Sequence, residues 1–341
     1  MNVPLFSRLS RWCSPTASGL TILAVALWIG GISLPTNVRA AQPNRSGDRV
    51  DNDVKYVNCS SSNKRDNSIN TALAALDPSE NNTIYVRGAC NENVNITSFD
   101  RLTLIAQDGA SITNVSGGTL PTISITDSGR VSIQGFTVNG DGNPNDQFAV
   151  INVTGSTVYF SGNTVQGGGS DDIDFYLGSK ATFNGDVIQN AVGDGIFLGQ
   201  NSTVMAEPIT IQGIAGVGAE VDVSSFLLLR GSLVQNNTLG ISIYLNGTVR
   251  LARTTITGNT GDGIDVIDHS TLVFGGAPSS ITANGGVGIL VKDLSFATID
   301  GSPIVVTGNL GSEDVLCSPQ FPATRGMLTS IGGGKTNCVE P

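Results

Sequence analysis

Carboxylates in the central part of the chain fall at spacings that would bring them to one surface. The series contains Asp174, Glu220, Asp222 and Asp265. Asp222 follows Glu220 by two positions, so both side chains would leave an extended strand on the same side. Two carboxyl groups on one surface supply the general acid and the base or nucleophile that cleave a glycosidic bond. Tyr176 and Tyr244 occur in the same stretches, and an aromatic ring suits the apolar face of a sugar. These residues predict a carbohydrate site.

Basic residues offer a different chemistry. A lyase or an epimerase removes a proton next to a carboxylate, which requires a base such as Lys, Arg, His or Tyr. Lys292 falls in register with the tyrosines, and His269 is the single histidine of the chain. Three arginines, Arg230, Arg250 and Arg253, fall on the following strand or its turns. No spacing selects one of these bases over the others.

A third chemistry is cation binding. Asp171, Asp172 and Asp194, together with Asp174, are predicted to lie on adjacent repeats. Hard cations such as calcium take several carboxylate and carbonyl oxygens as ligands. The same carboxylates also fit a solvated acidic surface without any chemistry, and the sequence leaves these interpretations open.

A short repeat, with the period of a solenoid coil, must position all these side chains. Small turn residues precede short apolar strands at nearly constant intervals, at Ser156, Ser179, Ser202, Ser225, Gly247, Ser270 and Ser295. Glutamines recur at one constant interval, at Gln166, Gln189, Gln212 and Gln235. A third strand in each repeat carries an isoleucine, at Ile173, Ile196, Ile241, Ile264 and Ile289. Three short strands per repeat predict a solenoid of stacked coils, with the glutamines as an amide ladder.

Side chains alternate along the third strand, so the repeat also predicts faces. Val150 and Ile173 begin the core column, and Ile151 begins the outward column that contains Asp174. Coils lie about 4.8 Å apart, and side chains two residues apart on a strand lie about 6.6 Å apart. Glu220 and Asp222 would then have about the carboxylate separation of an inverting glycosidase. Several other polar residues are predicted to lie in turns, at Asp194, Asn259, Asp262, Asp268 and His269.

The coil length, the three strands per coil and the rhythm of GNTGDGIDV (258–266) resemble the right-handed parallel β-helix of the pectin lyase-like superfamily. The resemblance covers roughly residues 82–319. It implies an all-β, single-stranded, right-handed parallel β-helix of about nine coils. That superfamily includes lyases, hydrolases, epimerases and adhesins, and in its lyases calcium offsets the charge of the uronate substrate.

Motifs of single families within that superfamily are only partly present. Asp171-Asp172 resembles the paired aspartates of polygalacturonase-like hydrolases, but the NTD, GHG and RIK motifs are absent. Asp268-His269 resembles the WIDH segment of pectate lyases, but Val266-Ile267 replaces its Trp-Ile and the RxPxxR motif is missing. No Gly-rich phosphate loop or GxSxG elbow occurs either. The sequence therefore matches no specific enzyme family.

The ends of the solenoid carry their own signals. Residues 68–76 read SINTALAAL, with Ser68 as an N-cap and with Ile69, Leu73 and Leu76 on one helical face. We predict a short capping helix there, because an open solenoid end exposes unpaired strand edges. Of the three possible connectivities of four cysteines, local pairing as Cys59–Cys90 and Cys317–Cys338 is the simplest.

The first 40 residues have the layout of a secretory signal peptide. Arg8 and Arg11 precede the apolar run 19–34, and small residues surround Ala40. The run is shorter than the ~20 residues that span a bilayer, which favours cleavage over a retained anchor helix. The predicted organisation is a signal peptide (1–40), an N-terminal cap with the first coil (41–100), the β-helix (101–310) and a C-terminal cap (311–341).

Charge and targeting limit the partners. All 28 acidic residues but only 15 of the 18 basic ones follow residue 40, so the mature chain has a formal net charge of −13. Such a surface repels nucleic acids, and it repels acidic polysaccharides unless a metal ion or a local basic patch intervenes. We expect a secreted or periplasmic monomer without a stable membrane span.

Two classes of function remain open. The first is a carbohydrate-active protein that binds an extended polysaccharide along its coils and cleaves or epimerises it, as a lyase, epimerase or hydrolase. The second is a non-catalytic cell-surface, adhesive or structural solenoid. No cofactor is indicated other than calcium.

Overall fold

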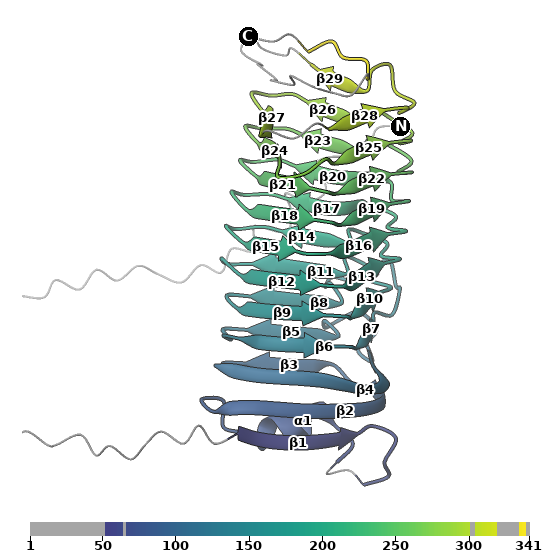
Figure 1. Ribbon diagram of the computed structural model, residues 1–341. Helices are drawn as coiled ribbons and strands as arrows, with labels where there is room; N and C mark the ends of the chain where they lie inside the picture. The colour runs from purple at the N-terminus through teal and green to yellow at the C-terminus, as the bar shows by residue number, and fades with distance from the viewer. Residues whose placement is uncertain (1–51, 64–65, 301–303, 319–333, 339–341) are drawn as a thin grey trace, which may run out of the picture. The chain divides into compact units, whose positions relative to one another are not determined.

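Between residues 52 and 317, the described chain winds into a parallel β-helix (Figure 1). The computed structural model describes residues 52–63, 66–300, 304–318 and 334–338. The predicted signal peptide lies outside these residues. Every pairing between strands of these residues is parallel and joins one coil to the next, and the predicted coil of three strands is confirmed. No helix of the described residues is long and apolar enough to cross a membrane.

One sheet, which we call sheet A, contains 19 strands in two columns that follow each other along the chain. Its first three strands are long: β1 (Asn52–Asn58), β2 (Asn81–Asn91) and β4 (Arg101–Thr113). The first column continues through β6 (Val131–Gln134), β9 (Thr157–Ser161), β12 (Lys180–Asn184), β15 (Thr203–Ala206), β18 (Phe226–Arg230), β21 (Thr248–Ala252), β24 (Thr271–Gly275) and β27 (Phe296–Asp300). The second column continues through β7 (Thr137–Asn139), β10 (Thr164–Gln166), β13 (Asp186–Gln189), β16 (Ile209–Gln212), β19 (Leu233–Gln235), β22 (Thr255–Thr257), β25 (Ser280–Thr282) and β28 (Val305–Thr307).

The other sheet, sheet B, holds the third strand of every coil. Its members are β3 (Val94–Thr97), β5 (Ile123–Thr126), β8 (Ile151–Thr154), β11 (Ile173–Tyr176), β14 (Ile196–Leu198), β17 (Val217–Val221), β20 (Leu239–Ile243), β23 (Ile264–Val266), β26 (Ile289–Val291) and β29 (Val315–Cys317). These ten strands of the described chain give ten coils, one more than the sequence predicts. The difference arises at the ends, where the repeat in the sequence fades.

Apolar side chains of successive coils stack into the core. Ile173, Ile196 and Ile264 lie in the predicted core column of sheet B, with no exposed surface. Each such side chain contributes roughly 1.5–3 kcal/mol by leaving water. The predicted register is wrong at one coil, because Ile151, and not Val150, pairs with Ile173. Ile151 is therefore a core residue, and Asn152 takes its place in the outward column.

Polar ladders run through the corners of the coils. The predicted amide ladder is confirmed, because Gln212 Nε2 donates to Gln189 Oε1 at 3.0 Å and Gln235 Nε2 donates to Gln212 Oε1 at 3.0 Å. Asn259 lies in a turn as predicted, but its side chain is buried and donates to Asn284 Oδ1 at 2.8 Å. These bonds satisfy polar groups that the stacking of coils removes from water.

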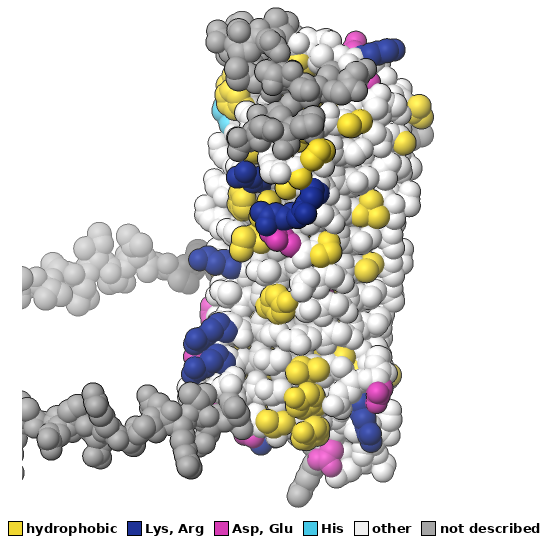
Figure 2. All heavy atoms as spheres, in the orientation of Figure 1, with side chains coloured by type: hydrophobic (Ala, Val, Ile, Leu, Met, Phe, Trp, Pro, Cys, Tyr) yellow, Lys and Arg dark blue, Asp and Glu magenta, His cyan; other side chains and the backbone are white. Residues whose placement is uncertain are grey.

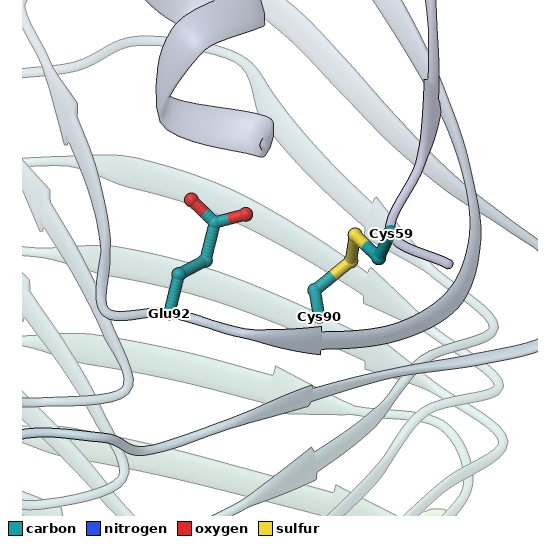
Figure 3. Close-up of side chains that lie close together, drawn as sticks. All are labelled: Cys59, Cys90 and Glu92. Carbon is teal, nitrogen blue, oxygen red and sulfur yellow. A yellow bond between two sulfur atoms is a disulfide. The ribbon is translucent and has the colours of Figure 1, made fainter. Parts of the chain in front are cut away.

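The N-terminal end carries the predicted capping helix, α1 (Ile69–Ala74), which lies against β1, β2 and β3. Ser68 is its N-cap and accepts a hydrogen bond from the Thr71 N–H. The carboxylate of Glu92 points toward this helix (Figure 3) and accepts from the Ile69 N–H at 2.7 Å and from Ser68 Oγ at 2.9 Å. Glu92 is thus a second cap that the sequence does not reveal.

Both predicted disulfides form. Cys59–Cys90 joins the segment after β1 to β2, and Cys317–Cys338 joins β29 to the segment 334–338. That segment also pairs with β29, because the Asp314 and Val315 N–H groups donate to the Lys335 carbonyl at 2.9 and 3.0 Å. Each loop closure contributes about 3–4 kcal/mol to stability.

Candidate functional site

The outer face of sheet B carries the predicted carboxylates. Strand register places Asp174, Phe197, Glu220, Ser242 and Asp265 in one column, on five successive coils. The second outward column, two residues further on, contains Tyr176, Gly199, Asp222, Tyr244, Ile267 and Lys292. Side chains of these two columns take part in three clusters, each built from two adjacent coils.

The central cluster joins Glu220, Asp222 and Tyr244. Tyr244 Oη donates a hydrogen bond of 2.9 Å to Glu220 Oε1. Burial, and next the negative charges of Glu220 and Asp222, raise the pKa of Tyr244 well above its usual range. The tyrosine therefore keeps its proton at neutral pH and acts as a donor to the carboxylates. Glu220 and Asp222 are 7% and 6% exposed, so little bulk water competes with this contact.

Glu220 and Asp222 come from one strand and its end. Glu220 is the fourth residue of β17, and Asp222 follows that strand directly. Two residues of extended chain span about 6.6 Å. That spacing lies at the lower edge of the range of about 6.5–9.5 Å at which two carboxyl groups leave room for a water molecule beside a glycosidic bond.

The second cluster lies two coils earlier, around Asp174. Tyr176 Oη donates to Asp174 Oδ2 at 3.0 Å, while Asp174 Oδ1 has no hydrogen-bond partner among the described residues. Burial, and next the charge of Asp171, raise the pKa of Asp174 well above its usual range. The ring of Tyr176 packs against Phe197 with centroids 5.5 Å apart. Phe197 is a residue that the prediction missed, although its place in the outward column between Asp174 and Glu220 was available as a signal.

The third cluster surrounds Asp265. Burial, and next the charge of Asp262, raise the pKa of Asp265 to about 7, while the charge of Lys292 lowers it. His269 does not join this cluster: it is exposed in the turn after β23, where its backbone N–H donates to the Asp293 carbonyl at 3.0 Å. The charge of Lys292 thus acts on Asp265, and His269 lies outside the cluster.

The aspartates predicted to bind a metal have structural partners instead. Asp171 Oδ1 accepts from the Asp194 N–H at 2.6 Å, and Asp194 Oδ1 accepts from the Val217 N–H at 3.0 Å. Asp172 Oδ1 accepts from the Gly168 N–H at 2.9 Å. The bonds of Asp171 and Asp194 hold one turn against the next, and the bond of Asp172 lies within its own turn. Asp194 therefore has the turn role that the sequence predicts.

The described part of the chain does not offer these aspartates as one ligand set. Within it, three ligand atoms of His, Cys, Asp or Glu lie within 4.8 Å of one another only at Cys59, Cys90 and Glu92. The two cysteines there form a disulfide (Figure 3). The arrangement of Asp171, Asp172 and Asp194 therefore does not fit a calcium ion.

Comparison with known proteins agrees with this architecture. A family model described as a right-handed beta helix region matches residues 121–277. No curated protein matches the chain by sequence. The solved structures that resemble it share at most 18% sequence identity in the three cases described next, so these likenesses concern the fold.

An alginate lyase from Paenibacillus sp. str. FPU-7 is 14% identical, with a TM-score of 0.53 over 77% of this chain and 98% of that chain. The A-module of the mannuronan C-5 epimerase AlgE4 from Azotobacter vinelandii is 12% identical, with a TM-score of 0.53 over 73% and 86%. The pectin methylesterase PemA from Erwinia chrysanthemi is 18% identical, with a TM-score of 0.50 over 62% and 79%. The chain therefore has the fold of a right-handed parallel β-helix, the fold that these solved structures share.

Proposed function

We propose that this protein is a secreted carbohydrate-active β-helix protein that binds an extended polysaccharide along the outer face of sheet B and hydrolyses it. The observation that carries the proposal is the pair Glu220 and Asp222, with the Tyr244 hydroxyl bonded to Glu220. Proteins of the same fold act on polysaccharides, among them the alginate lyase, the mannuronan epimerase and the pectin methylesterase named above. The two disulfides support an extracellular location, since such bonds persist in oxidising compartments.

The carboxyl pair supplies the two proton transfers of hydrolysis. One carboxyl group gives its proton to the glycosidic oxygen as the bond from that oxygen to the anomeric carbon breaks. The other carboxylate takes a proton from the water whose oxygen attacks the same carbon. Tyr244 orients Glu220 through its hydrogen bond and does not itself transfer a proton to or from the substrate.

The neighbouring clusters serve as sugar-binding sites. Tyr176 and Phe197 form an aromatic platform one to two coils before the carboxyl pair, and an aromatic face suits the apolar C–H face of a pyranose. Coils about 4.8 Å apart let consecutive sugars lie across consecutive coils. The acidic surroundings of the pair favour a glycan segment without charge, such as a neutral or esterified one.

Proton abstraction by a lyase or an epimerase has weaker support. Tyr244 holds its proton because its pKa is raised, so it is a poor base. His269 lies exposed in a turn, outside the clusters. Lys292 is the basic residue beside Asp265, three coils from the Glu220 strand along sheet B. Hydrolysis by the carboxyl pair is therefore the reaction that the geometry supports best.

A glycan screen tests this proposal. The protein is incubated with neutral, esterified and acidic plant and algal polysaccharides, and both reducing ends and absorbance at about 235 nm are followed, because hydrolysis yields only the former. We expect reducing ends with at least one neutral or esterified glycan. Glu220→Gln and Asp222→Asn should each lower the rate at least about 100-fold, as loss of a general acid or base does. Ser242→Ala, in the same column, is the matched control.

Each other outcome has a defined meaning. An absorbance increase at that wavelength without dependence on Glu220 contradicts hydrolysis in favour of a lyase. Retention of glycans without any turnover contradicts catalysis and supports the non-catalytic adhesive class. If Glu220→Gln is as active as the wild type, the pair of Glu220 and Asp222 does not catalyse the reaction.

A further inference from the structure

A groove of about 290 Å³ lies on the outer side of sheet A, whereas the carboxylate clusters lie on the outer face of sheet B. Its charged lining residues are all arginines, namely Arg230, Arg250 and Arg253, and Leu228, Gly275 and Gly276 also line it. Figure 2 shows Lys and Arg side chains gathered beside an acidic side chain on the upper part of the face in view. No residue of this groove takes part in the proposed hydrolysis.

Three adjacent coils build the groove. Arg230 ends β18, Arg250 lies in the middle of β21, and Arg253 follows β21 directly. Leu228 and Arg250 are register partners, so an apolar side chain lies beside a guanidinium group. On the third coil, a Cβ atom added to Gly275 would come within 2.8 Å of Arg250 Nη2. The glycine thus leaves the space in which the guanidinium group of Arg250 lies.

The charge of the groove is opposite to that of the protein. The chain has a formal net charge of −10, and only seven of residues 101–300 are Lys or Arg. Three of these seven line the groove. Glu207 neutralises one of them through a salt bridge of 2.8 Å between its Oε1 and Arg230 Nη1. No described carboxylate forms a salt bridge with Arg253, so the groove keeps positive charge on an acidic surface.

We propose that this groove binds carboxylate groups of an acidic polysaccharide, a polyuronate, and so retains the protein on an acidic matrix while sheet B acts on uncharged segments. Guanidinium groups present donors in a fork that matches a carboxylate, and Leu228 offers apolar contact to the sugar ring. This inference rests on the proposed function for its ligand class. Three arginines are too few for a nucleic-acid duplex, which requires many phosphate contacts to overcome a net negative protein.

Affinity electrophoresis of the full-length mature protein tests the groove. Gels contain either polygalacturonate or the same polymer after full methyl esterification, which removes its charge. We expect retardation by polygalacturonate only, and weaker retardation at higher ionic strength, because salt screens exposed charges. The double substitution Arg250→Gln with Arg253→Gln should raise the dissociation constant for polygalacturonate at least about tenfold, because charge-assisted hydrogen bonds to its carboxylates are lost. Lys180→Gln, an exposed substitution on β12 of the same column, is the matched control.

The outcomes separate this inference from the proposed function. If the double variant and the wild type bind polygalacturonate equally well, the groove is not the binding site. This conclusion holds whatever effect Glu220→Gln has on cleavage. Equal binding of the charged and the esterified polymer also overturns this inference. Loss of binding in the double variant alone, with an unchanged melting temperature, supports the groove even if no glycan is cleaved.

Discussion

Tyr244 donates a hydrogen bond of 2.9 Å to Glu220, which lies one coil earlier and in the other outward column of sheet B. The contact joins β17 to the end of β20, and it places a protonated hydroxyl against two carboxylates. Such a contact stabilises charge that stacked coils would otherwise bring together without compensation.

Removal of this hydroxyl should destabilise the protein. Tyr244→Phe removes the charge-assisted hydrogen bond from the hydroxyl to Glu220, and we expect the free energy of unfolding to fall by about 1–3 kcal/mol. Chemical denaturation measures the change. Tyr56→Phe is the control, because Tyr56 is 68% exposed. An unchanged Tyr244→Phe midpoint would show that the hydrogen bond has no net effect.

Asp265 should make stability depend on pH. Its pKa is raised to about 7, so the folded state binds a proton more tightly than the unfolded state, whose carboxyl titrates near 3.8. The bound proton therefore contributes fully to the free energy of unfolding below about pH 4. This contribution, roughly 2–4 kcal/mol, is lost as the pH rises through about 7. Asp265→Asn removes this loss.

The measurement is the difference in unfolding free energy between wild type and Asp265→Asn at several pH values. As the pH rises from 4 to 7, the unfolding free energy of Asp265→Asn should increase relative to that of the wild type. Ser242→Ala should show no such increase. Asp262→Asn should reduce the effect, because the charge of Asp262 contributes to the raised pKa. A constant difference across this range would contradict the assignment.

The amide ladder predicts graded effects. Gln212 makes two rungs, to Gln189 and from Gln235, whereas Gln235 is the end of the series and makes one rung among the described residues. With about 1 kcal/mol per hydrogen bond, Gln212→Ala should cost about 2 kcal/mol and Gln235→Ala about half of that. Thermal or chemical unfolding of both variants checks the ratio. Equal costs would mean that the ladder contributes no more than local packing.

The cap of α1 offers a fourth test. Glu92 accepts hydrogen bonds from the Ile69 N–H and from Ser68 Oγ at the helix start. Glu92→Ala should lower the free energy of unfolding by about 1–2 kcal/mol, the usual effect of a lost cap. Glu80→Ala, before β2, is the control. A loss of stability equal in both variants would argue against a capping role.

Several features of the site follow from the sequence because the coil is nearly constant in length. The side-chain period of two, combined with this constant coil, is sufficient to place Asp174, Glu220 and Asp265 in one outward column. The prediction slips at Val150 because the coil from Ile151 to Ile173 is one residue shorter than the coil that follows it. A shift of one residue inverts the two faces of a strand.

Contacts across coils needed the tertiary structure. Side-chain rotamers and turn shapes decide these contacts. They place the Tyr244 hydroxyl on Glu220, Asp262 rather than His269 beside Asp265, and Arg250 over Gly275. The sequence by itself determined the fold and the columns of sheet B, since both follow from a period. The three-dimensional structure decided which columns become clusters, because burial and hydrogen bonding act between residues that the period brings close without orienting them.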